Sequence, residues 1–432
     1  MTSSKFLIAA ANSGAGKTTV TLGLMRAISM CGRSVQPFKC GPDYIDTKLH
    51  KLAGEKDSIN LDLFLSSSDY LVRLFNKYSS LADVSVVEGA MGLFDGYDKM
   101  KGSAAEVAKF AKLPVILVVN AKASAYSVAA LLYGFKHFDQ ELQVKGVIFN
   151  FVASESHYAF LKEACADVGI ESLGYLPKDV NFEIPSRHLG LNTDETGQVK
   201  QVIDELGEKV SQYINITRLL ELTQFSPTEF EEVKAVDTSL GTIAIAKDEA
   251  FNFVYLENLK ALEERGSVTY FSPLRDKQLP EADFVYIPGG YPELYASLLS
   301  ENKSMLQSIK SYVEHGGKLW AECGGMMYLS DLIETRDGTC YPMVGVFNQK
   351  SSMREMKLKL GYRTIEYQGV RLKGHEFHYS RIISDLNSVA CQFNAKGKAV
   401  DTKLLRYKNA IGGYTHLYWA ENIADWLRIF KN

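Results

Sequence analysis

Short apolar runs alternate with amphipathic segments along the first half of the chain. The runs have strand length and are nearly continuous; they span residues 6–10, 34–39, 84–88, 115–120 and 144–151. Continuous apolar strands are typical of a parallel sheet whose two faces are both covered by helices. Between the first two runs, residues 18–30 carry apolar side chains at helical spacing. This alternation predicts a doubly wound α/β domain with a parallel sheet.

The pattern breaks at residues 226–240, which are polar, acidic and rich in turn-forming residues, as a linker would be. Apolar strand-like runs then return at residues 242–246, 268–271, 284–288 and 318–321. We therefore expect two α/β domains, formed by residues 1–225 and residues 241–432.

Composition excludes several classes of protein. The 432 residues include 48 Lys+Arg and 51 Asp+Glu, a net charge of −3, whereas a general nucleic-acid binder would normally carry a basic excess. The longest apolar runs, such as residues 113–119, are far shorter than the roughly 20 residues of a membrane span. None of the six cysteines forms a C-x-x-C pair, which fits a protein of the reducing cytoplasm.

A glycine-rich segment after the first predicted strand matches the P-loop pattern in spacing, with Ala11 in place of its first glycine. Backbone amides of such a loop can turn toward phosphate oxygens, and the following helix adds positive potential. Lys17 can neutralise the β- and γ-phosphates, and the hydroxyl of Thr18 can bind Mg²⁺. The residues expected to bind ATP are Asn12, Ser13, Gly14, Ala15, Gly16, Lys17, Thr18 and Thr19.

Acidic side chains near the ends of other predicted strands would complete a magnesium site. Mg²⁺ takes oxygen ligands, and carboxylates at the carboxyl edge of a parallel sheet face the ligand crevice. We expect Asp46 and Glu88 to hold the ion together with Thr18, and Asp43 is the next candidate. Helix capping is the plainer role for any one of these acids.

A P-loop switch ATPase that binds partners is the alternative from another class. Partitioning ATPases carry a second lysine near the start of the loop, and this chain has Asn12 there. The terminal segment 421–430 lacks the strongly basic face of an amphipathic membrane anchor, so we expect a docked helix.

A cysteine followed by two glycines after a predicted strand resembles a nucleophile elbow. The turn would expose the thiol of Cys323, and the helix that follows would lower its pKa. His416 is the candidate base, and the backbone amides of Gly289, Gly290 and Gly324 are candidates for an oxyanion hole. Taken alone, Cys323 could equally be a buried structural thiol.

His375, Glu376 and His378 form a further polar cluster. Their spacing differs from H-E-x-x-H, which excludes a metalloprotease motif. A structural or interdomain role and a substrate role both remain open.

Motifs along nearly the whole chain together resemble the cobyrinate a,c-diamide synthase family. They are AANSGAGKTTVTLGLMRA, FKCGPDYIDTKLH, VVEGAMGLFDG, PSRHLGL, IPGGYPELYA, ECGGMMYLSD, GHEFHYS and GGYTHLYWAEN. The N-terminal half is also similar to dethiobiotin synthetase. The resemblance implies an N-terminal P-loop synthetase domain fused to a C-terminal glutamine amidotransferase domain of the class I type.

The resemblance further implies an ATP-dependent ligase of cobalamin biosynthesis that takes nitrogen from L-glutamine. Its substrate would be a corrin-type polycarboxylate, amidated at the a and c acetates through an acyl phosphate. Hydrogenobyrinate and nickel sirohydrochlorin are alternatives to cobyrinate, and a homodimer is an open possibility. Residues that would contact the substrate are Lys39, Asp43, Tyr44, Arg187 and His188.

Two positions depart from the expected patterns. Class I amidotransferases carry a glutamate two residues after the catalytic histidine, where this chain has Tyr418. The chain also has Asn120 where the family resemblance implies an aspartate. A Cys–His pair without an obvious third member is therefore expected.

Overall fold

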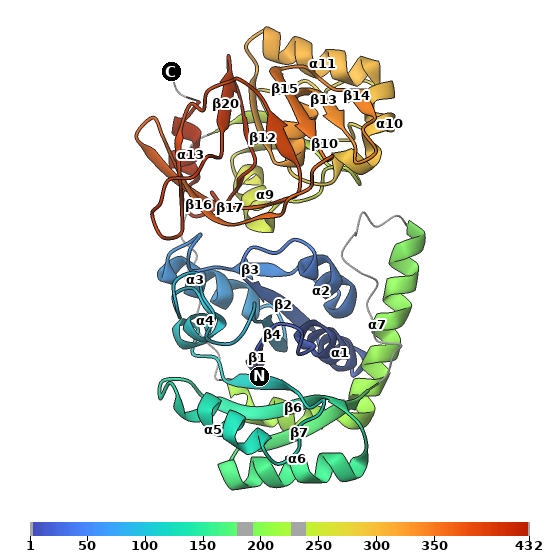
Figure 1. Ribbon diagram of the computed structural model, residues 1–432, viewed down its shortest axis with the longest axis vertical. Helices are drawn as coiled ribbons and strands as arrows, with labels where there is room; N and C mark the ends of the chain where they lie inside the picture. Colours follow the sequence, from blue (N-terminus) through green and yellow to red (C-terminus); the bar gives the residue numbers. More distant parts are fainter. Residues whose placement is uncertain (1–2, 179–192, 226–238, 431–432) are drawn as a thin grey trace. The chain divides into compact units, whose positions relative to one another are not determined.

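The computed structural model describes residues 3–178, 193–225 and 239–430. The chain divides into two compact units, Met1–Glu232 and Val233–Asn432 (Figure 1). The division falls within the predicted linker, and most of that linker lies outside the described residues. The exact domain bounds therefore stay a prediction. Arg187 and His188 also lie outside the described residues.

A seven-strand parallel path forms the centre of the N-terminal unit, in the order β3-β2-β4-β1-β5-β6-β7. The short β8 (Gln224–Phe225) adds to β1 in the antiparallel sense. The predicted doubly wound parallel sheet is thus confirmed. The parallel strands are β1 (Ser3–Ala10), β2 (Val35–Cys40), β3 (Ile59–Leu61), β4 (Val84–Glu88), β5 (Val115–Asn120), β6 (Val144–Val152) and β7 (Glu171–Pro177).

Helices lie on both faces of this sheet (Figure 1). On one face, α1 (Lys17–Met30), α2 (Asp46–Gly54) and α7 (Thr193–Tyr213) cover the strands and bury a shared apolar core. The opposite face carries α3 (Ser68–Ser79) and α4 (Ala104–Phe110). The remaining helices are α5 (Val128–His137), α6 (Glu155–Val168) and α8 (Ile216–Leu222). Covering both faces explains why most residues of these strands are apolar.

The C-terminal unit contains a six-stranded sheet of order β10-β9-β11-β12-β21-β20, which confirms the predicted α/β class. All neighbours in it are parallel except β20 and β21. The strands are β9 (Gly241–Ala246), β10 (Gly266–Phe271), β11 (Phe284–Ile287), β12 (Lys318–Glu322), β20 (Leu404–Tyr407) and β21 (Ala410–Gly413).

Two four-stranded sheets, which the sequence analysis did not predict, complete this unit. Their orders are β14-β13-β15-β18 and β19-β16-β17-β22. Charged residues interrupt their apolar positions, so they lack the continuous apolar runs of the central strands. Their members are β13 (Ser330–Glu334), β14 (Cys340–Pro342), β15 (Phe347–Ser352), β16 (Lys359–Tyr367), β17 (Val370–His378), β18 (Arg381–Ile383), β19 (Cys391–Asn394) and β22 (His416–Leu417).

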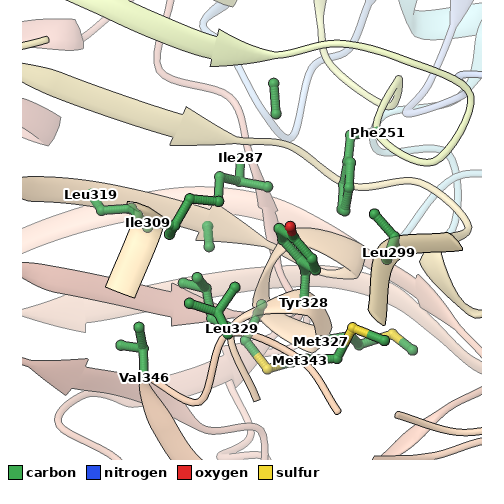
Figure 2. Close-up of a cluster of buried hydrophobic side chains, with 14 of the residues drawn as sticks. Phe251, Ile287, Leu299, Ile309, Leu319, Met327, Tyr328, Leu329, Met343 and Val346 are labelled. Carbon is green, nitrogen blue, oxygen red and sulfur yellow. The ribbon is translucent and has the colours of Figure 1, made fainter. Parts of the chain in front are cut away.

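Two apolar clusters sandwich the six-stranded sheet. One joins the sheet to α10 (Ala296–Glu301), α11 (Lys303–Glu314) and α12 (Gly324–Tyr328). Figure 2 shows Met327 and Tyr328 of α12 among Phe251, Ile287 and Leu299. The other cluster contains α9 (Leu256–Glu263), the β16–β17 hairpin and α13 (Ile423–Arg428). The packing of α12 in the first cluster anchors the turn at Cys323.

The terminal helix α13 docks onto its own unit, as predicted. Trp426 is fully buried and its ring stacks on that of Trp419 at 4.2 Å. Across the described part of the chain, no helix combines the length and apolarity that crossing a bilayer requires.

Candidate active sites

The glycine-rich loop joins β1 to α1 with two residues in the left-handed region. Gly14 and Gly16 have φ angles of 80° and 88°, values that residues other than glycine rarely adopt. Gly16 caps the N-terminus of α1, and the first amides of a helix have no acceptor within the helix. The loop therefore has the backbone geometry of an anion-binding site at a helix N-terminus.

Asn150, which the sequence analysis missed, supports this loop from the end of β6. Its buried side-chain amide donates to the carbonyl oxygen of Ala15 at 3.1 Å. A Cβ on Gly16 would lie 2.0 Å from Asn150 Nδ2, so only glycine fits there. The sequence pointed instead to Asn120, which pairs with Asn150 in the sheet. Asn120 is exposed and accepts a hydrogen bond from the amide of Lys122.

Lys17 and Thr18 extend from the first turn of α1 toward the end of β4. The ammonium group of Lys17 donates to the carbonyl oxygen of Met91. The hydroxyl of Thr18 donates to Glu88 Oε1 at 2.7 Å. The predicted hydroxyl and one predicted carboxylate of the magnesium site are thus in direct contact.

Glu88 is the centre of a buried polar network. Lys39 Nζ lies 3.0 Å from Glu88 Oε1 and 2.5 Å from Asp46 Oδ2. The buried ring of His50, between Ser58 Oγ and Glu88 Oε2, contacts the second carboxylate oxygen at 2.6 Å. Although burial opposes ionisation, Lys39 and then His50 and Thr18 hold the pKa of Glu88 below its ordinary value. Glu88 is therefore a fixed anion.

Asp46 differs from Glu88 in its electrostatics. Burial and the negative charge of Glu88 raise the pKa of Asp46 to about 6, against the opposing effect of Lys39. Two carboxylates and a hydroxyl form an all-oxygen donor set, which suits Mg²⁺. Thr18, Glu88 and Asp46 are thus the residues that would hold the ion, which would neutralise phosphate charge. Among the described residues, no three His, Cys, Asp or Glu side chains gather as a metal site.

The other predicted substrate residues in this unit lie on the loop between β2 and α2. Asp43 Oδ1 accepts hydrogen bonds from the amides of Ile45 and Asp46, at 2.8 and 2.9 Å. This carboxylate therefore orders the turn before α2, which is the plainer role considered for it. Tyr44 is buried, and Lys39 is engaged by the two acids. Substrate contacts of these residues stay predictions.

In the C-terminal unit, Cys323 occupies a sharp turn between β12 and α12. Its φ of 46° and ψ of −106° are strained for a residue with a side chain. The Cys323 amide donates to the carbonyl oxygen of Gly413 at 2.7 Å, which fixes the turn to β21. The side chain is 5% exposed. Such strain at the end of a strand is the signature of a nucleophile elbow.

The expected low pKa of the thiol is wrong for this structure. Burial, followed by the negative charge of Glu293, raises the pKa of Cys323 well above its ordinary value. The Gly324 amide, which hydrogen-bonds the sulfur, acts in the opposite direction without overcoming these effects. A nearby base must therefore accept the thiol proton.

Backbone geometry brings the predicted oxyanion-hole glycines together. The carbonyl oxygen of Gly289 accepts from the amides of Asn252 and Phe253, both at 3.0 Å. Because a peptide N–H points opposite to its C=O, the Gly290 amide is directed away from that loop. A Cβ on Gly324 would lie 3.0 Å from Gly290 N. The two amides thus flank the elbow.

His416 lies against the same glycine loop. A Cβ on Gly289 would lie 2.2 Å from His416 Cε1, so the ring contacts the bare backbone. Burial, then the charges of His375 and His378, lower the pKa of His416 far below its ordinary value. The imidazole is therefore neutral, which is the form that can accept a proton.

Glu322 directly precedes Cys323 and also contacts the segment that carries His416. Its buried carboxylate accepts from Tyr286 Oη and Trp320 Nε1, each at 2.9 Å. Glu322 Oε1 also accepts from the amide of Leu417, the neighbour of His416, at 3.0 Å. Burial raises the pKa of Glu322 to about 7. Sequence analysis missed this residue, although an acid within an apolar strand was a visible signal.

Comparisons with known proteins match both units of the chain. A family model for the CobQ/CobB/MinD/ParA nucleotide binding domain matches residues 6–191, and one for the CobB/CobQ-like glutamine amidotransferase domain matches residues 242–423. A cobyrinate a,c-diamide synthase of Caldanaerobacter subterraneus is 44% identical, with 95% of this chain and 94% of that protein covered. The chain belongs to the cobyrinate a,c-diamide synthase family.

More distant members of the family match equally completely. The synthase of Listeria innocua is 42% identical over 99% of this chain and 98% of its own length. That of Methanocaldococcus jannaschii is 37% identical over 97% of this chain and 96% of its own length. The predicted family and enzyme class, a carbon–nitrogen ligase with glutamine as nitrogen donor, are therefore confirmed.

Proposed function

We propose that this enzyme amidates the a and c acetate carboxylates of cobyrinate, with ATP as co-substrate and glutamine as nitrogen donor. The observation that carries the proposal is that one chain, related over nearly its whole length to cobyrinate a,c-diamide synthases, holds both a phosphate loop and a cysteine elbow. Each site supplies one half of a glutamine-dependent amidation. The alternative, a switch ATPase whose amidotransferase-like domain is inert, gives no reason for the His416 ring to lie against the Gly289 loop.

The phosphate loop would activate the acid. A carboxylate oxygen of the substrate attacks the γ-phosphorus of ATP, the bond to the bridging oxygen breaks, and ADP leaves. The product is an acyl phosphate, whose phosphate is a far better leaving group than oxide. Lys17 and the first amides of α1 would neutralise charge on the phosphates. Bound Mg²⁺, held by Thr18, Glu88 and Asp46, would neutralise further phosphate charge.

The cysteine elbow would release ammonia. His416 takes the proton of the Cys323 thiol as the sulfur attacks the side-chain amide of glutamine. The developing oxyanion would be stabilised by the amides of Gly290 and Gly324, with Gly289 shaping the loop. Ammonia leaves with the proton returned from His416, and water then hydrolyses the glutamyl thioester to glutamate.

Ammonia displaces phosphate from the acyl phosphate and forms the amide. Each cycle converts one carboxylate, ATP, glutamine and water into an amide, ADP, phosphate and glutamate. Two cycles, at the a and c side chains, would give the diamide. We place the reaction in the cytoplasm, where cobalamin intermediates, ATP and glutamine would meet the enzyme.

Incubation with candidate rings tests this function. The purified protein receives ATP, Mg²⁺ and glutamine with cobyrinate, hydrogenobyrinate or nickel sirohydrochlorin, and mass spectrometry counts the carboxylates converted. We expect two amides on cobyrinate. Preferential amidation of another ring would assign that substrate instead, and amidation of none would refute the proposal.

The Cys323→Ala variant separates the two half-reactions. It should lose glutamine-dependent amidation and retain amidation with ammonium chloride, because ammonia bypasses the elbow. If the folded variant also loses ammonia-dependent amidation, the assigned division of labour is wrong.

A further inference from the structure

A buried ion pair lies on the β16–β17 hairpin, within the motif whose role the sequence left open. Arg363 Nη2 and Glu376 Oε2 are 2.6 Å apart. Arg363 is 9% exposed and Glu376 is fully buried. The two residues share one face of the hairpin, because Arg363 pairs with Gly374, two positions before Glu376.

The hydrogen bonding of this pair is incomplete. Arg363 Nη1 donates to the carbonyl oxygen of Tyr362 at 2.9 Å. Glu376 Oε1 and Arg363 Nε are both buried, and neither has a hydrogen-bond partner among the residues that the structure describes. Buried charges are costly unless all their polar atoms are paired. One acceptor atom of the anion and one donor atom of the cation are thus left without a hydrogen-bond partner among the described residues.

The face of the hairpin that carries this pair packs next to the cysteine elbow. Burial and, after it, the negative charge of Glu376 raise the pKa of Cys323 and the pKa of Tyr414. The charge of Cys323 also raises the pKa of Tyr414. His378, two positions after Glu376 and therefore on the same face of β17, stacks its ring on that of Tyr414 at 3.6 Å. Tyr414 directly follows Gly413, whose carbonyl oxygen accepts from the Cys323 amide at 2.7 Å. The ion pair therefore lies on the face of the hairpin that contacts Tyr414, next to the turn at Cys323.

We propose that Arg363 and Glu376 form the subsite for the charged end of glutamine. Glutamine carries a carboxylate and an ammonium group on one carbon, three bonds from its side-chain amide carbon. Arg363 would bind the carboxylate, and Glu376 Oε1 would accept from the ammonium group. This inference rests on the proposed use of glutamine at Cys323.

Such a subsite would select glutamine among small amides. Glutaramate lacks the ammonium group, and 4-aminobutanamide lacks the carboxylate, while both keep the reactive amide. An ion pair already held in place by the hairpin needs little reorganisation when the ligand binds. Recognition would thus depend on two charges placed at a fixed separation from the thiol.

Covalent labelling of Cys323 tests the subsite in the full-length protein. The reagent 6-diazo-5-oxo-L-norleucine carries both charged groups of glutamine, whereas iodoacetamide carries neither. We expect Glu376→Gln to slow labelling by the glutamine analogue by about 10-fold to 100-fold, the range for a hydrogen bond to a charged group. Labelling by iodoacetamide should change less than about 3-fold, since no charged contact is involved.

Glu334→Gln is the matched control. Glu334 lies on β13 in the same unit, is 8% exposed in its side chain, and pairs with Lys350 Nζ at 2.9 Å. Loss of this pair should change neither labelling rate. Thermal unfolding of each variant verifies that it is folded before labelling.

The outcomes distinguish this inference from the proposed function. If the wild-type protein is not labelled by the glutamine analogue, glutamine use at Cys323 is wrong. If the wild type is labelled and Glu376→Gln reacts equally fast, or slows equally with both reagents, the subsite is refuted. If Glu376→Gln does not fold, Arg363→Lys gives the same comparison.

Steady-state kinetics supply a second criterion. The Glu376→Gln variant should raise the KM for glutamine more than it lowers kcat. The wild-type preference for glutamine over glutaramate should shrink by the same factor, because the lost contact is the one that glutaramate lacks. An unchanged preference would refute the assignment of the ammonium group to Glu376.

Discussion

Adding a single methyl group at Gly289 should disable glutamine hydrolysis. The new Cβ would lie 2.2 Å from His416 Cε1 and 3.0 Å from its Nδ1. Unbonded carbon atoms rest about 3.5 Å apart, so the ring would have to move by roughly 1.3 Å. His416 is buried and stacks on His375, which leaves it little room to move without distorting β22.

The displacement sets the size of the effect. A misplacement of about 1 Å can cost about 100-fold in rate, and loss of a general base costs about 100-fold to 10,000-fold. We therefore expect Gly289→Ala to lower kcat/KM for glutamine hydrolysis at least about 100-fold, or about 2.7 kcal/mol in activation free energy. Overpacking should also lower the free energy of unfolding by about 1–3 kcal/mol.

The assay compares glutamate release and amidation with glutamine or ammonium chloride. Ammonia-dependent amidation should persist, because the change affects only the glutaminase site. Gly134→Ala in α5 is the control, since nothing lies within 4 Å of its Cβ and alanine favours a helix by up to about 1 kcal/mol. Wild-type glutamine hydrolysis in a folded Gly289→Ala protein would refute the placement of His416.

Three further predictions concern the phosphate loop and pH. Lys17→Ala should lower amidation at least about 100-fold with either nitrogen source and leave glutamine hydrolysis measurable, because the role proposed for Lys17 is confined to the nucleotide. Full ammonia-dependent amidation would contradict the ATP site. Asn150→Ala removes the hydrogen bond to the Ala15 carbonyl and should lower the free energy of unfolding by about 0.5–1.5 kcal/mol. It should also weaken ATP binding, measured by calorimetry, and an unchanged ATP affinity would contradict the support of the loop by Asn150. Burial lowers the pKa of His378 from 6.5 to about 4, so the unfolded chain takes up this proton first as pH falls. The free energy of unfolding should therefore fall by about 3 kcal/mol between pH 6.5 and 4 on account of His378, and denaturant titrations of His378→Phe should show a shallower pH dependence than wild type.

The elements around both candidate sites were predictable from local sequence. The P-loop spacing places Gly14, Gly16 and Lys17 between an apolar strand and a helix, and the structure has that arrangement. The elbow at Cys323 was equally predictable, because a strand followed by a cysteine and two glycines is a local pattern. Backbone conformation over a few residues depends mainly on those residues.

The state of the chemical groups was not predictable in the same way. The short helix after Cys323 suggested a lowered pKa, yet burial and Glu293 raise it. Lys39 is expected to contact the substrate, which stays a prediction, and the structure adds that it lies between Glu88 and Asp46 in a polar network that the chain order does not reveal. Desolvation and charge pairing depend on neighbours from several strands, which a linear pattern does not specify.

The sequence by itself determined the class of fold and identified the candidate phosphate loop and the candidate nucleophile, since each is encoded by contiguous residues. Only the tertiary structure decided which distant groups support them. Asn150 reaches the loop across 135 positions, and Glu322 reaches the neighbour of His416 across 95. The first contact arises because parallel strands far apart in the chain end at a common edge. The second joins β12 of the six-stranded sheet to β22 of a neighbouring sheet, a packing that no local pattern specifies.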